Sequence, residues 1–186
     1  MLSLNSAIIY GAILLTILIA IGIYNRLVRL NNLVQEAWSG IDIQLKRRSD
    51  LIPNLVSTVQ GYSQHETNLL TKVTQLRSSA LNAESINDQI KAEAGLTGAL
   101  NTLFAVSENY PDLKANQNFI HLQAELTSIE DQLQLARRYY NATARDFNTS
   151  LQTFPSSLVA QYLKYPPAIY FEVSNTGERE NPTIKL

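Results

Sequence analysis

Apolar residues dominate the start of the chain and then settle into a helical spacing. From Ala7 to Tyr24 the sequence runs for 18 residues without a charged side chain. A helix of that length spans about 27 Å, close to the ~30 Å thickness of the hydrocarbon core of a bilayer. We therefore predict one transmembrane helix over residues 7–24, within an N-terminal segment formed by residues 1–25.

Two other interpretations of this run stay open. A cleaved signal peptide typically has basic residues before the apolar run and a small-residue cleavage site after it, and the sequence shows neither. The buried helix of a soluble domain is seldom this long without a charge. Arg26 and Arg29 follow the run closely, so the positive-inside rule places the later part of the chain in the cytoplasm and the N-terminus outside.

Beyond the span, apolar residues recur every seven positions in two long stretches, which is typical of packed helices. In the first stretch the repeating residues are Leu27, Val34, Ile41, Leu55 and Tyr62. In the second they are Phe119, Leu126, Leu133, Tyr140, Phe147 and Phe154. The first pattern begins directly after the span, so we expect one continuous helix. Pro53 interrupts that helix and predicts a kink near residues 49–53.

Shorter patterns complete the expected fold. We predict helices at about 64–81, from Ser85 to about 107 and around 157–163, with a turn at 109–112 and a short β-like run at 169–173. A capping box of Ser63 and Glu66 would start the first of these helices, and Ser85 would cap the second. The predicted fold is all-α: an N-terminal transmembrane helix that continues into an antiparallel up-and-down bundle of about four long helices. The bundle covers residues 26–165, and a Pro-containing, mostly irregular tail covers residues 166–186.

Composition narrows the chemistry that the chain can perform. The formal net charge is −1, there is no Cys, and there are two His residues. A near-neutral chain does not favour nucleic-acid binding, and the sequence contains no phosphate-binding loop, nucleophile elbow or zinc-protease motif. We therefore expect no catalytic, cofactor-binding or metal-binding residues and no small-molecule substrate, and we predict that the protein is not an enzyme.

A set of polar residues on the first and last long helices forms the candidate interaction site. Arg48 falls on the apolar seam, and a buried Arg needs a carboxylate partner, for which Glu125 and Glu130 are the candidates. Such a layer could set the register of the bundle, or it could serve partner docking or self-assembly. The full set is Gln44, Arg47, Arg48, Asp50, Glu125, Glu130, Arg137, Asn141 and Asn148.

Several motifs together resemble the LemA family. They are Tyr24-Asn25-Arg26-Leu27-Val28, Glu36-Ala37-Trp38-Ser39-Gly40-Ile41-Asp42, Leu45-Lys46-Arg47-Arg48-Ser49-Asp50-Leu51-Ile52-Pro53-Asn54-Leu55-Val56, Tyr110-Pro111-Asp112-Leu113-Lys114-Ala115 and Ala136-Arg137-Arg138-Tyr139-Tyr140-Asn141. The resemblance covers about residues 24–173 in order. It implies a helical bundle on a bacterial membrane, exposed to the cytoplasm, with no established enzyme activity. A relative of this family is associated with magnetosome membrane formation.

We infer a non-enzymatic, single-pass protein of the bacterial cytoplasmic (inner) membrane. Its predicted role is that of a self-associating scaffold that organises the membrane or membrane-bound partners. The expected partners are the lipid bilayer, further copies of the chain and other membrane proteins. The alternative is an adaptor or signalling module that binds another membrane protein through the bundle face or the C-terminal tail.

Overall fold

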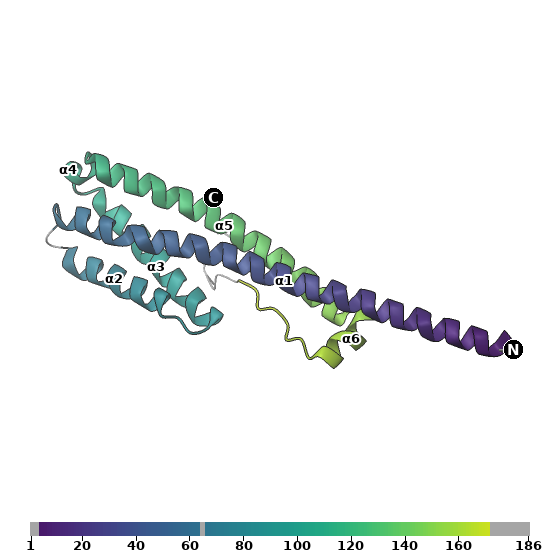
Figure 1. The fold of residues 1–186 in the computed structure, drawn as a ribbon. Helices are drawn as coiled ribbons and strands as arrows, with labels where there is room; N and C mark the ends of the chain where they lie inside the picture. The colour runs from purple at the N-terminus through teal and green to yellow at the C-terminus, as the bar shows by residue number, and fades with distance from the viewer. Residues whose placement is uncertain (1–3, 64–65, 172–186) are drawn as a thin grey trace, which may run out of the picture. The chain divides into compact units, whose positions relative to one another are not determined.

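The chain is helical throughout most of residues 4–63 and 66–171, which are the residues that the computed structural model describes (Figure 1). No strand occurs within these ranges, so the all-α prediction is confirmed. The helices are α1 (Leu4–Gln60), α2 (Thr67–Leu81), α3 (Ile86–Ser107), α4 (Pro111–Lys114), α5 (Gln117–Gln152) and α6 (Ser156–Leu163). They form two compact units, to both of which α1 and α5 contribute.

Unit 2 contains residues 43–63 and 66–134 and is a helical bundle. The end of α1, α2, α3 and the first half of α5 lie side by side, joined by short connections that reverse the chain direction (Figure 1). One apolar core fills the space between them. Its buried members are Ile52, Leu55, Val59, Leu70, Val73, Leu96, Ala99, Leu100, Leu103, Leu113, Phe119, Leu122 and Leu126.

Unit 1 contains residues 4–42 and 135–170, from α1, the second half of α5, α6 and the extended segment after it. The Trp38 and Tyr140 rings meet edge to face, with centroids 5.3 Å apart and an interplanar angle of 65°. Leu27, Val34 and Ile41 are buried in this unit, as their heptad positions predict. By contrast, the apolar side chains of α1 between Ile8 and Ile21 are exposed.

Pro53 does not end α1, which continues to Gln60. A proline has no backbone N–H, so the carbonyl of Ser49, four residues earlier, loses its usual helical donor. The Arg77 side chain replaces that donor, because its Nε donates to the Ser49 carbonyl oxygen over 2.7 Å. Arg77 lies on α2, so the carbonyl that the proline frees becomes a point of attachment between two helices of unit 2.

The predicted Ser85 cap of α3 is confirmed, whereas the predicted capping box at the start of α2 is wrong. Ser85 caps α3, since its hydroxyl accepts from the Asp88 backbone N–H at 3.1 Å. At α2 the N-cap residue is Glu66, without a side-chain capping bond, so no Ser63–Glu66 capping box forms. Residues 64 and 65, where we placed the start of α2, lie outside the described residues.

Three further sequence expectations need correction. Phe154 and Tyr62 close their heptad patterns but are exposed, because α5 ends at Gln152 and α1 ends at Gln60 before these positions. The turn expected at 109–112 contains the start of α4, where Pro111 occupies the first helical turn. Residues 169–171 are irregular rather than β-like, and the remainder of that predicted run lies outside the described residues.

Candidate functional site

Arg48 is the centre of a buried charged cluster in unit 2. Its position on the seam of α1 turns the side chain into the bundle, where it is 1% exposed. Its guanidinium forms an ion pair with Glu93 of α3 and donates through Nη1 to Glu130 Oε2 of α5 at 2.8 Å. The same Nη1 donates to Thr97 Oγ1 at 2.9 Å. We call Arg48, Glu93, Thr97 and Glu130 the Arg48 cluster.

The Arg48 cluster sets one cation against two carboxylates. Glu93 is 2% exposed, whereas the Glu130 side chain is 29% exposed, so Glu130 keeps part of its hydration and Glu93 depends on Arg48. Taking charges out of water costs several kcal/mol per ion unless they are paired with good geometry. The cluster thus links α1, α3 and α5 within unit 2.

The groups of the Arg48 cluster that could take part in proton transfer are the two carboxylates, and both are paired with Arg48. A guanidinium stays protonated at every physiological pH, so it cannot serve as a general base. Thr97 accepts a hydrogen bond from the same guanidinium nitrogen that donates to Glu130. Within the described residues, no group of three or more His, Asp or Glu side chains is placed to hold a metal ion.

The structure separates several predicted site residues from the Arg48 cluster. Of the two carboxylates proposed to pair with Arg48, Glu130 does so, whereas Glu125 lies 3.9 Å from His121 on the surface of α5. The prediction for Glu125 is therefore wrong. Glu125 follows His121 by four residues on α5, so the two side chains lie on the same face of that helix. The sequence pattern also missed Glu93, which contributes the most deeply buried carboxylate.

The remaining predicted residues of α1 lie at the surface of unit 2. Arg47 Nη1 donates to Gln44 Oε1 and to Gln132 Oε1, each at 3.2 Å. Asp50 forms an exposed ion pair with Lys46 at 3.3 Å, four residues earlier on the same helix. These contacts are exposed, so the residues that make them are not part of a buried layer. An exposed ion pair contributes about 0–1 kcal/mol to stability.

The other predicted residues belong to unit 1. Asn148 is buried, and its side-chain amide makes two hydrogen bonds to the backbone of Ala168: Nδ2 donates to the carbonyl oxygen, and Oδ1 accepts from the N–H, each at 2.8 Å. Arg137 and Asn141 are half-buried on α5. Nearby, the Tyr140 hydroxyl donates to the Ile169 carbonyl at 2.7 Å, so α5 holds the segment that follows α6.

Two tyrosines have altered acidity. The Tyr110 hydroxyl donates to Glu66 Oε1 at 3.1 Å, and this hydrogen bond to a carboxylate raises the pKa of Tyr110 above its usual value. Burial raises the pKa of Tyr140, because the phenolate would lose its hydration in the interior of unit 1. Both groups therefore stay neutral at physiological pH and act as hydrogen-bond donors.

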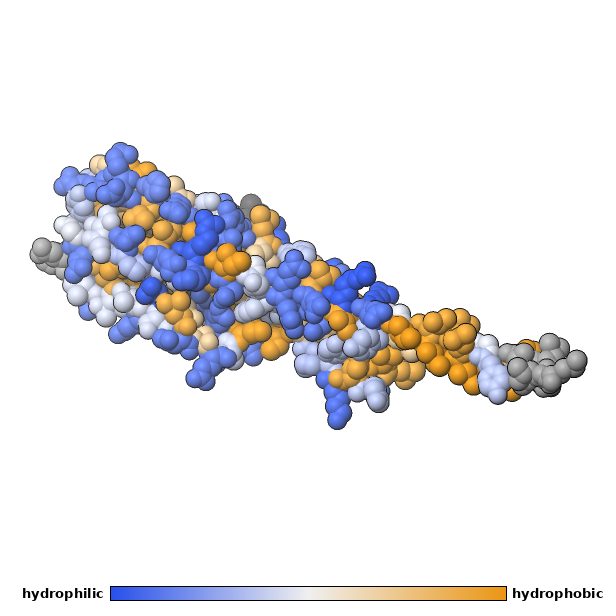
Figure 2. Space-filling view, viewed as in Figure 1, coloured by the Kyte–Doolittle hydropathy of each residue, from blue (hydrophilic) through white to orange (hydrophobic). Residues whose placement is uncertain are grey.

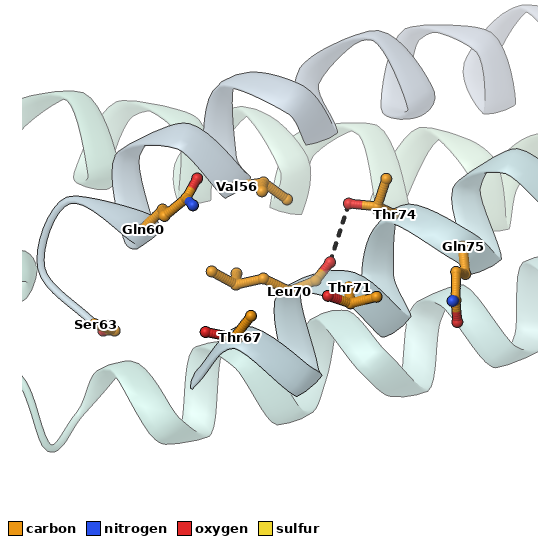
Figure 3. A pocket seen from close by; sticks show the side chains of 8 residues that line it. All are labelled: Val56, Gln60, Ser63, Thr67, Leu70, Thr71, Thr74 and Gln75. Atoms are coloured by element: carbon orange, nitrogen blue, oxygen red, sulfur yellow. Dashed lines mark hydrogen bonds between the residues drawn. The ribbon is translucent and has the colours of Figure 1, made fainter. Parts of the chain in front are cut away.

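Unit 2 has at least three grooves that could admit a small molecule, and the one that contains His121 measures about 400 Å³. Two others have a more apolar lining. One, of about 230 Å³, lies beside the Arg48 cluster and is lined by apolar residues such as Leu100 and Phe104 together with Glu130. The other, of about 570 Å³, lies between α1 and α2 (Figure 3). Its lining residues are Val56, Gln60, Ser63, Thr67, Leu70, Thr71, Thr74 and Gln75. None of these is an acid or a base near neutral pH, so this groove offers no pair of groups for proton transfer.

Comparison with known proteins matches the chain to one family model and to several bacterial relatives. The model of the LemA family matches residues 37–186. Protein LemA of Metamycoplasma hominis is 32% identical over 173 residues, which cover 89% of this chain and 76% of that protein. Magnetosome protein MamQ 2 of Paramagnetospirillum magneticum is 23% identical over 189 residues, which cover 88% of this chain and 70% of that protein. Magnetosome protein MamQ of Magnetospirillum gryphiswaldense is 22% identical over 181 residues, which cover 83% of this chain and 66% of that protein.

Proposed function

We propose that this chain, which belongs to the LemA family, is a non-enzymatic, single-pass protein of the bacterial inner membrane that self-associates as a helical scaffold. In this proposal residues 7–24 cross the bilayer, and the helical region that follows lies in the cytoplasm. The tail from residue 166 is an additional contact for membrane-bound partners.

The observation that carries the proposal is the continuity of α1. This one helix of 57 residues includes a stretch long and apolar enough to cross a membrane, none of it buried within the protein. Further along, the same helix supplies Leu27, Ile41 and Leu55 to the interiors of the two units. A buried core helix would have its apolar run covered, and a signal peptide would be removed at its end. The exposed run and the unbroken helix instead favour a permanent anchor that is rigidly joined to the folded region.

The relatives support a membrane role without defining it. Three of them are named magnetosome proteins, and each aligns with more than four-fifths of this chain. The family match extends from residue 37 through the whole helical region, so the resemblance does not depend on the apolar run alone.

Self-association is supported by apolar side chains on the outer face of α5. Leu135 and Tyr139 are each more than half exposed and lie four residues apart, on one face of the helix. Because each side chain is already partly covered, burying the exposed remainder would stabilise an interface by about 1–2 kcal/mol per side chain. A second copy of the chain would cover both, and this pair marks the surface at which a variant should weaken assembly.

The test uses the full-length chain in mild detergent and in native membranes. We expect a homo-oligomer by light scattering and native mass spectrometry. Because the chain contains no Cys, Tyr139→Cys adds a single thiol, which we expect to crosslink two copies within the membrane. Leu135→Glu should weaken the assembly, whereas Gln134→Glu, with the same charge at the neighbouring exposed position, should leave it intact.

Two results would contradict the scaffold. One is a monomer at every concentration in detergent, with no crosslinked pair in membranes. The other is a stable complex with a different membrane protein that contains one copy of this chain, which would instead favour the adaptor. A thiol placed at the exposed Ser79 tests the topology, since it should react only with reagents that reach the cytoplasm.

A further inference from the structure

The short helix α6 carries an exposed apolar face beside the end of the proposed span. Phe154, Leu158 and Tyr162 are 77%, 60% and 87% exposed. Leu158 and Tyr162 are four residues apart and lie on one side of α6, and Phe154 lies two residues before the helix begins at Ser156. Large apolar side chains that gather on one surface mark a contact with another apolar phase.

The position of this face relative to α1 is fixed within unit 1. Phe154 and Ser156 line one groove of about 350 Å³ together with Ile23, Arg26 and Leu30 of α1. Arg26 is the first charged residue after the apolar run. The beginning of α6 therefore lies at the level where the apolar part of α1 gives way to its polar part. Figure 2 shows apolar surface over α6 beside the exposed apolar part of α1.

The opposite side of α6 is held by unit 1, so the apolar face cannot simply turn inward. Ala160 is buried, and the Ser156 hydroxyl donates to the carbonyl oxygens of Ser150 at 2.6 Å and Thr153 at 2.8 Å. These bonds connect the start of α6 to the end of α5. The outward direction of Leu158 and Tyr162 is consequently a property of the folded unit.

The charge pattern of this part of the chain fits the surface of a bilayer. Lys164 is the one charged residue between positions 147 and 171. Tyrosine is enriched where the headgroups meet the hydrocarbon core, since its ring is apolar and its hydroxyl is polar. A cation beside such a helix is attracted to anionic lipid headgroups.

We propose that α6 is a second membrane contact, which lies in the headgroup region with Phe154, Leu158 and Tyr162 inserted among the lipid chains. This inference rests on the proposed function, because it requires that residues 7–24 span the bilayer. Two contacts on different elements would fix the tilt of unit 1 against the membrane surface, which a single spanning helix leaves free.

The test uses the full-length chain in liposomes of phosphatidylcholine and phosphatidylglycerol. Gln161→Cys places an environment-sensitive fluorophore on α6 while the three apolar side chains stay native. Ser79→Cys on α2 gives a label in water, and Leu14→Cys gives a label in the bilayer. We expect the label at position 161 to be quenched by brominated lipid, and to be quenched by aqueous iodide several-fold less than the label at position 79.

A variant of the same labelled protein tests whether the apolar face causes the insertion. With Leu158→Ser and Tyr162→Ser, iodide quenching at position 161 should rise to the value at position 79, while the Leu14→Cys label stays in lipid. A label at position 161 that is as open to iodide as the label at position 79 would overturn the inference. Protection from iodide without quenching by brominated lipid would also overturn it, in favour of a protein contact. Failure of the Leu14→Cys label to enter lipid would instead overturn the proposed span itself.

Discussion

Removal of the Arg48 guanidinium should destabilise unit 2 by an amount that depends on pH. Arg48→Met keeps an apolar stem of similar length but leaves Glu93, which is 2% exposed, without its cation. Breaking a buried ion pair by removing one partner costs about 3–5 kcal/mol. Glu130 adds less, because it is 29% exposed and can recover its hydration.

The loss of stability that Glu93 causes in Arg48→Met has an upper limit, because Glu93 can take up a proton instead of staying charged in the interior. Keeping a carboxyl with a reference pKa of about 4.3 protonated at pH 7 costs roughly 3.7 kcal/mol, since each pH unit is worth about 1.36 kcal/mol. At pH 5 the same cost falls to about 1 kcal/mol. Burial without a cation favours the neutral form of Glu93 in the folded variant, so we expect the stability of the variant to fall as pH rises. The penalty of Arg48→Met should therefore shrink as the solution becomes more acidic.

The assay is chemical unfolding of the full-length chain in mild detergent, followed by far-ultraviolet circular dichroism at both pH values. Arg47→Met is the matched control, because Arg47 makes only exposed hydrogen bonds to Gln44 and Gln132 in the contacts described, and we expect a change within about 0.5 kcal/mol. Arg48→Met combined with Glu93→Leu removes both buried charges and should recover most of the stability. Equal effects of Arg48→Met and Arg47→Met, or a penalty that is the same at both pH values, would refute the reasoning.

Three further perturbations test other contacts. Arg77→Met should lower the free energy of unfolding in urea by about 1–3 kcal/mol, because the Ser49 carbonyl loses its donor. The loss should be clearly smaller in a Pro53→Ala background, where the alanine N–H can donate to that carbonyl, and equal losses in both backgrounds would contradict this. Asn148→Leu should speed amide hydrogen exchange at Ala168, whose N–H loses its acceptor, and unchanged exchange would count against the contact. Because the raised pKa of Tyr110 lets the folded chain keep its proton longer than the unfolded chain, stability should fall as pH rises above about 10, and Tyr110→Phe should reduce that fall in thermal melts.

Much of the fold could be predicted from the sequence, because heptad spacing directly reflects which side of a helix is buried. The seam that places Leu27 and Leu55 in the interior also places Arg48 there, and the need of a buried guanidinium for a carboxylate led to Glu130. Phe154 shows the limit of the pattern, since its phase is right but α5 ends two residues before it. Periodicity describes the face of a helix and contains little information about where the helix stops.

Glu93 was missed because an apolar pattern alone gives no reason to place a carboxylate in the interior of α3. Glu93 is buried, whereas Ala94 beside it is exposed. Positions 93, 96, 100, 103 and 107 alternate three and four apart, so Glu93 occupies a seam position just as Arg48 does. Two opposite charges that interrupt the seams of two helices predict a pair. Arg77 offers no such pattern, because its partner is a backbone carbonyl that only the loss of the Pro53 donor makes available.

The pairing of Asn148 with Ala168 limits which residues can occupy position 148. A carboxamide has the same donor and acceptor groups as a peptide unit, so a side chain of α5 here does what a neighbouring β-strand would do for one residue of an extended chain. A helix cannot pair with a strand through its own backbone, whose donors and acceptors are already used. Aspartate would lack the donor and leucine would lack both groups, while glutamine would place its amide one methylene too far out. We therefore expect selection at position 148 to preserve asparagine for its likeness to a peptide bond, independently of any role in binding.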